Sequence, residues 1–194
     1  EVLPDYVYSY KFFKAEPIKW RVITTDYNGT GNKLLLAENI LISGEHCIDH
    51  HTREINGNTI YPNNYKESRI RAFLNGLSYF EFQETNEEFI GKGFLQTAFT
   101  ESMQSKIVIT KVDNSLASTG TSSNDYICDD TEDRIFSLSY ADTTNSSYGL
   151  NINDARIRMP TDFALATGAV KGLLKDFIGG HWWMRSPDSD QRAN

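Results

Sequence analysis

The sequence predicts an α+β fold, in which short strands and short helices mix without the regular strand–helix–strand order of a parallel sheet. Two strand-like segments, 18–24 and 33–37, flank a run of turn-forming residues and predict an antiparallel hairpin. Four apolar residues recur at the spacing of one helix face: Ile70, Phe73, Leu74 and Leu77. Long polar stretches separate these segments, so we expect long loops between the elements.

The remaining elements are expected from the same patterns. Alternating side chains over 6–13 predict a strand that joins the hairpin in a meander. Asn64 is the expected N-cap of the helix with the apolar face, because Glu67 stands at capping-box spacing from it. The other predicted segments are strands at 107–112 and 134–138, helices at 94–99, from Thr100 and at 161–167, and polar loops at 44–64 and 113–133. The aromatic residues expected in the core are Trp20, Phe73, Phe136 and Trp182.

Length and charge limit the classes of function. A chain of 194 residues is long enough for one domain with its own core, so we expect a single domain over residues 1–194. The net charge of −7 disfavours nucleic-acid binding, which needs a clustered basic surface. No apolar run reaches the roughly 20 residues of a membrane helix, so no membrane span is expected.

The segment from Gly179 to Pro187 holds two adjacent tryptophans between a glycine pair and a proline, which predicts a short extended segment. Strand alternation would place Trp182 and Met184 on an apolar face, with Trp183 and Arg185 on the other. We therefore expect a binding surface composed of Trp183 and Arg185 with the nearby His181 and Asp188. The alternative is that Arg185 pairs with a carboxylate such as Asp162 and fixes the 160–166 helix.

Two clusters have side chains that can bind metal ions. His46, Cys47 and His50 offer nitrogen and sulfur ligands of the type that zinc prefers. Asp129 and Asp130 belong to an acidic loop whose carboxylates suit calcium. Solvated loops are the alternative interpretation of both clusters. The two cysteines, Cys47 and Cys128, either form a disulfide or remain free thiols.

Several blocks of the sequence resemble one family. These blocks are 16–22, 34–36, 64–75, 133–139, 156–164 and the closing Trp182-Trp183-Met184-Arg185-Ser186-Pro187. Together they resemble a bacterial domain of unknown function, number six-two-seven-three, over about residues 16–194. The resemblance implies an exported or cell-surface protein. Members of that family continue past the two tryptophans to a closing strand, so the final strand is expected to be missing from this chain.

A more distant likeness concerns the fold. Arg158-Met159-Pro160-Thr161-Asp162, followed by a helix and then by Trp182-Trp183, is similar to a pattern in C-type-lectin-like domains, a group that includes formylglycine-generating enzymes. The likeness implies a mixed or antiparallel sheet with short helices and long loops. It does not imply the enzyme chemistry, because those enzymes use a cysteine pair late in the chain, where this chain has none.

These observations together predict a non-enzymatic ligand-binding or adhesion module of an exported bacterial surface protein. The expected partners are a glycan, a peptide or a host protein, and no cofactor is expected unless calcium or zinc is bound. Two alternatives remain open. One is a metal-dependent or formylglycine-generating type of enzyme, and the other is a structural module that self-associates.

Overall fold

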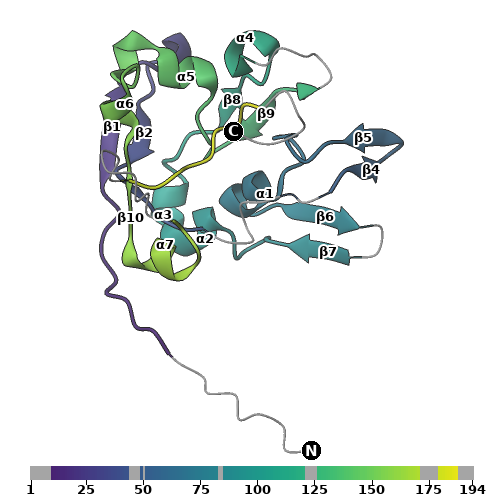
Figure 1. The fold of residues 1–194 in the computed structure, drawn as a ribbon, viewed down its shortest axis with the longest axis horizontal. Helices are drawn as coiled ribbons and strands as arrows, with labels where there is room; N and C mark the ends of the chain where they lie inside the picture. The colour runs from purple at the N-terminus through teal and green to yellow at the C-terminus, as the bar shows by residue number, and fades with distance from the viewer. Residues whose placement is uncertain are drawn as a thin grey trace, which may run out of the picture.

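The computed structural model describes residues 10–43, 49, 51–82, 85–120, 126–170 and 179–187, and Figure 1 shows their arrangement. Short helices and two-stranded sheets mix along the chain, which confirms the α+β class. In the described part, four strand pairs are antiparallel and one is parallel. No helix of these residues is long and apolar enough to cross a membrane.

The predicted hairpin is confirmed. β1 (Trp20–Thr24) pairs antiparallel with β2 (Leu34–Ala37). Its inner face buries Ile23 and Leu34, whereas the indole of Trp20 lies on the opposite face and is 36% exposed. The prediction of Trp20 as a core residue is therefore wrong, because strand alternation turns it away from the buried Ile23.

Two clusters of buried apolar side chains form the core. The first cluster contains Ile23, Tyr27, Leu34, Leu138 and Leu150, with Phe136 and Trp182 packed against it. The second cluster contains Ala72, Phe73, Tyr79 and Phe89, with Ile70, Leu74 and Phe94 among the side chains packed against it. The core positions predicted for Phe73, Phe136 and Trp182 are confirmed.

The helix of the second cluster is α1 (Arg69–Asn75), which begins four residues later than a cap at Asn64 predicts. Its N-cap is Ser68, whose hydroxyl accepts a hydrogen bond from the Arg71 N–H. The side chain of Asn64 instead accepts from the Glu67 N–H at 3.0 Å and closes a turn before the helix. The predicted cap at Asn64 is thus wrong, because an Asx turn uses the same side-chain acceptor.

Two other helix starts were predicted from caps and are confirmed. Thr100 caps α3 (Glu101–Gln104) by accepting from the Met103 N–H. Thr161 caps α7 (Asp162–Ala166) in the same way. α2 (Phe94–Ala98) and β8 (Thr110–Val112) also lie within their predicted segments.

Several predicted strands and loops need correction. Residues 10–13 form no strand and lie exposed, whereas 6–9 lie outside the described residues. Residues 134–138 also form no strand, because the N–H groups of Arg134 and Ile135 donate to the Asn75 side chain instead of to a neighbouring strand. The segment 113–133 contains α4 (Leu116–Thr119) and β9 (Thr131–Asp133), which pairs with β8.

The expected loop at 44–64 contains a hairpin of β4 (Arg53–Ile55) and β5 (Asn58–Ile60). Its turn is Asn56-Gly57, with positive φ values of 52° and 77°, which is the geometry favoured for a two-residue hairpin turn. The other elements are β6 (Ser78–Phe82), β7 (Thr85–Glu88), α5 (Tyr140–Thr144), α6 (Asn153–Arg156), β3 (Asn39–Ile40), β10 (Met159–Pro160) and 3₁₀ turns at Tyr27–Gly29 and Ser146–Tyr148. β10 runs parallel to β3 and so joins the closing part of the chain to the hairpin.

Candidate functional site

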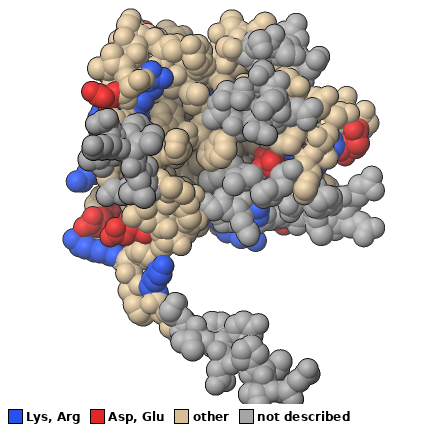
Figure 2. Space-filling view, in the orientation of Figure 1, with Lys and Arg blue, Asp and Glu red and all other residues tan. Residues whose placement is uncertain are grey.

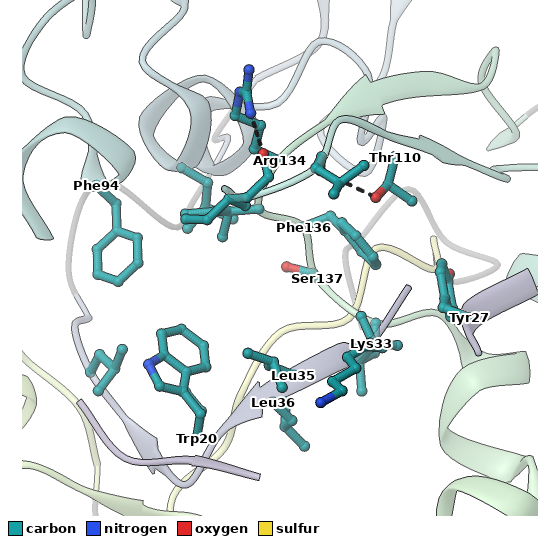
Figure 3. Close-up of a pocket in the computed structure, with 18 of the residues that line it drawn as sticks. Trp20, Tyr27, Lys33, Leu35, Leu36, Phe94, Thr110, Arg134, Phe136 and Ser137 are labelled. Carbon is teal, nitrogen blue, oxygen red and sulfur yellow. Dashed lines mark hydrogen bonds between the residues drawn. The ribbon is translucent and has the colours of Figure 1, made fainter. Parts of the chain in front are cut away.

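A cleft of about 1270 Å³ opens between the β1–β2 hairpin and the segment that runs from α2 to β8. Its walls come mainly from residues 30–43, 106–111, 134–138 and 181–183. In Figure 3, Trp20 and Phe94 lie on one side of the space, and Leu35 lies across it from Phe136. Both apolar clusters therefore contribute residues to the walls of one cleft.

The walls of the cleft are largely apolar, and part of the apolar surface is open. Three aliphatic side chains of the wall remain about half exposed, namely Leu35 at 46%, Val108 at 50% and Ile109 at 55%. Figure 2 shows that uncharged residues make up most of the described part of one face of the molecule, with charged residues mainly near its margin and one acidic group near its middle. Exposed apolar side chains that line one cleft are typical of surfaces that bind a ligand or a partner.

All three tryptophans of the chain line this cleft. The Trp20 ring stacks on Phe99, with centroids 6.1 Å apart, and so joins the hairpin to the end of α2. The Trp182 indole N–H donates to the Arg156 carbonyl at 2.9 Å, which fixes the ring against the first cluster. Trp183 is 40% exposed. Trp183 and His181, two of the predicted binding residues, both lie on the cleft wall.

Arg185 does not share that surface, because only 3% of it is exposed. Its Nη1 donates to Asp142 Oδ2 at 2.9 Å and to the Ser137 carbonyl at 2.8 Å. The structure therefore contains the buried ion pair that was the alternative prediction for Arg185, although its partner is Asp142 and not Asp162. Asp188 lies outside the described residues.

The predicted strand at this point is also absent. Residues 181–184 adopt no regular structure, and the segment is held at its ends. Gly180 forms a bridge to Arg158, and the Arg185 N–H donates to the Leu138 carbonyl at 3.0 Å. The Ser186 hydroxyl accepts from the Tyr140 N–H at 2.8 Å. Arg185 and Ser186 thus fix residues 137–140, which include the end of the 134–138 wall.

The ionisable side chains of the cleft are mostly cationic, although the whole chain has a net charge of −7. Lys111 is paired with Asp130 at 3.0 Å, and Arg134 donates to the Gln104 and Ile107 carbonyls. Lys33 and Lys106 form no ion pair with any residue that the structure describes. These two ammonium groups remain available to an anionic ligand.

Comparison with known proteins adds the family. Residues 30–194 match the family described as Domain of unknown function (DUF6273). The chain belongs to this family. No curated protein and no solved structure matches the chain. The matched residues of this DUF6273 domain include every wall segment of the cleft except the start of the hairpin at Trp20 and the turn before residue 30.

The residues predicted as metal ligands do not converge in the described part of the DUF6273 domain. Asp129 pairs with Lys66 at 2.8 Å, whereas Asp130 pairs with Lys111 and accepts from the Asn114 N–H, which lowers the pKa of Asp130. Within the described ranges, no group of three or more His, Cys, Asp or Glu could hold a metal ion. His46, Cys47 and His50 lie outside those ranges. Cys128 is a free thiol, and burial raises its pKa.

Sequence reasoning missed the main wall of the cleft. Two short apolar runs, 34–36 and 107–109, each follow directly after a lysine, Lys33 and Lys106. A continuous apolar run is usual for a strand that is covered on both faces. Here all three residues of each run line the cleft, and Leu35, Val108 and Ile109 are about half exposed. The lysine followed by three apolar residues, which both runs share, was the available signal for the wall.

Proposed function

We propose that this domain is a non-enzymatic binding module whose apolar cleft holds a ligand. The observation that carries the proposal is the apolar wall, where Leu35, Val108 and Ile109 are about half exposed beside all three tryptophans. Burying such side chains against a ligand is favourable by about 25 cal/mol for each Å² of apolar surface. A concave apolar site with a few polar groups is also the usual form of a small-molecule or peptide site.

The finer parts of the proposal concern the scaffold and its setting. We propose a C-type-lectin-like scaffold in an exported bacterial surface protein, with loops that present the site. This is supported by the order of the 158–162 block and the two tryptophans, which lie together through the bridge from Arg158 to Gly180. Glycans, peptides and host proteins are the candidate ligand classes, and an apolar cleft favours ligands that carry apolar groups.

The two alternative functions require different features of the same cleft. An enzyme of the metal-dependent or formylglycine-generating type would need reactive groups on the wall. Arg134 donates to backbone carbonyls and Lys111 pairs with Asp130, so His181 and Asp113 are the wall groups that such an enzyme would use. A self-associating module would cover the exposed apolar wall with a second copy. Sedimentation across a range of concentrations separates self-association from ligand binding.

The test uses the dye 8-anilinonaphthalene-1-sulfonate, which is apolar and anionic, with dye emission and tryptophan emission recorded together. The expected result is saturable binding to the folded protein with quenching of tryptophan, because all three indoles line the cleft. Ile109→Asn should weaken binding about fivefold, the equivalent of about 1 kcal/mol.

The matched control is Ile152→Asn, since Ile152 is similarly exposed but does not line the cleft. This variant should bind the dye as the parent does. Equal weakening by both variants, or dye emission that fails to saturate, would contradict the proposed site.

A further inference from the structure

The strands that border the cleft have free edges. In the described part of the chain, β2 pairs only with β1 and β8 pairs only with β9. Residues of both β2 and β8 line the cleft, and Figure 1 shows the two strand pairs on the same half of the molecule. An unpaired edge carries N–H and C=O groups that can hydrogen-bond to an added strand.

Backbone groups elsewhere on the wall also lack partners. The N–H of Val108 and both backbone groups of Phe136 form no hydrogen bond with any residue that the structure describes. Val108 lies two residues before the start of β8, and Phe136 lies in the 134–138 wall. A fatty acid would cover these backbone groups with an acyl chain that cannot form hydrogen bonds, which costs free energy. A peptide backbone would instead supply donors and acceptors.

The side chains of the wall define what such a peptide would carry. Leu35 and Ile109 favour aliphatic side chains on the face of the peptide that enters the cleft. Lys33 and Lys106 are cations without an ion-pair partner among the described residues, and the wall as a whole is more cationic than the chain. Complementary charges would therefore be acidic.

We propose that the cleft binds an extended apolar peptide segment, which adds as a strand along the free edge of β2 and carries acidic residues toward Lys33 and Lys106. This inference rests on the proposed function and names the ligand class of the same site. The backbone supplies affinity through hydrogen bonds, and alternate aliphatic side chains enter the cleft.

The experiment measures fluorescence anisotropy of a labelled decapeptide in which valine and threonine alternate before two C-terminal aspartates. A second peptide has the same side chains, but alternate backbone nitrogens are methylated and can no longer donate. We expect saturable binding of the first peptide and at least about tenfold weaker binding of the methylated one, since tenfold corresponds to about 1.4 kcal/mol. Replacing the two aspartates by lysines should weaken binding by about as much.

Protein variants locate the binding. Leu35→Asn should weaken peptide binding about tenfold, whereas Val22→Asn should not, because Val22 faces Leu35 across the hairpin but does not line the cleft. Both side chains are about half exposed, so circular dichroism should show the same fold in both variants. Lys33→Glu with Lys106→Glu should reduce binding of the aspartate peptide and improve binding of the lysine peptide.

The outcomes separate this inference from the proposed function. Equal affinity for the plain and methylated peptides, or binding of sodium dodecanoate with no binding of either peptide, overturns the added strand and leaves an apolar binding site. Sedimentation that shows the cleft covered by a second copy at assay concentrations also overturns it. If the peptides, dodecanoate and the naphthalene dye all fail to bind, both proposals are overturned.

Discussion

The guanidinium of Arg185 lies almost wholly buried, where an unpaired charge would be strongly unfavourable. Asp142 Oδ2 neutralises it and also accepts from the Ser139 N–H and hydroxyl at 2.8 and 2.9 Å. Arg185 Nη2 donates to the Ser118 hydroxyl at 3.2 Å, and the group lies 5.8 Å from the centre of the Phe136 ring. One side chain therefore connects three segments of the chain behind the cleft.

Arg185→Ala should lower the free energy of unfolding by about 3–5 kcal/mol, because it leaves the Asp142 carboxylate buried without its partner. Urea unfolding followed by tryptophan emission measures the loss. The control is Arg21→Ala, which breaks an exposed pair with Glu38 and should cost about 1 kcal/mol or less. Similar losses in the two variants would show that Arg185 has no special structural role.

Cys128 offers a second test at this scale. Burial raises the pKa of its thiol, so less of it is the reactive thiolate at pH 8 than in an exposed cysteine. In a Cys47→Ser background, iodoacetamide should modify Cys128 at least about tenfold more slowly in the folded protein than in urea. Equal rates in the two conditions would mean that the thiol is open to solvent.

At the scale of elements, the sequence predicted two caps and a hairpin that depend on residues close together in the chain. The caps at Thr100 and Thr161 and the hairpin over 20–37 depend on neighbouring residues, and all were predictable. The hairpin at Asn56-Gly57 has an equally local signal, but the surrounding polar residues concealed it. The strand expected at 134–138 failed because its partner is a side chain, Asn75, which is distant in sequence.

The same distinction explains the candidate site. Trp183 and His181 were predicted as binding residues from composition, and the structure places them on the cleft wall. A buried ion pair of Arg185 was one of the two predicted alternatives, and the structure contains it. Its partner Asp142 was not predictable, because it lies 43 residues away in the sequence. The cleft itself forms because the apolar runs 34–36 and 107–109 come close together in the folded chain. Their closeness could not be predicted from either run alone.

The junction of α1 with α2 allows a test of packing between elements. Gly93 is the N-cap of α2, and a methyl group there would lie 2.5 Å from the Phe73 carbonyl and 2.7 Å from Gly76 Cα. Gly93→Ala should therefore destabilise the protein by about 1–3 kcal/mol through overpacking against backbone. Ser102→Ala, at an exposed position on α3, should change stability by less than about 0.5 kcal/mol in the same urea titration. A Gly93→Ala protein as stable as this control would mean that α2 moves away without cost.

At the scale of the whole molecule, the cleft separates the two apolar clusters, and a polar network joins them again. Arg71 Nε donates to the buried carboxylate of Asp133 at 2.9 Å. Asn75 Nδ2 donates to the Ile135 carbonyl at 2.8 Å, beside the wall residue Phe136. Both donors belong to α1, whose apolar face forms the second cluster, and Phe136 packs on the first. These bonds, together with the stacking of Trp20 on Phe99, connect the two clusters in the described part of the chain.

This network should make the two clusters unfold together. Emission of Trp182 reports the first cluster, on which it packs, and emission of Trp20 reports the contact of β1 with Phe99. Far-ultraviolet circular dichroism includes α1 and α2 of the second cluster. The two signals should coincide in urea for the parent protein. Arg71→Met should cost about 3–5 kcal/mol, because among the described residues it leaves the buried Asp133 carboxylate with the Thr131 hydroxyl as its one donor. The variant should also separate the two transitions. Lys66→Met removes a more exposed pair with Asp129, so its transitions should still coincide.

If the Arg71→Met transitions also coincide, packing around the cleft must couple the clusters without the network. The cleft would then be a more rigid site than its open apolar wall suggests.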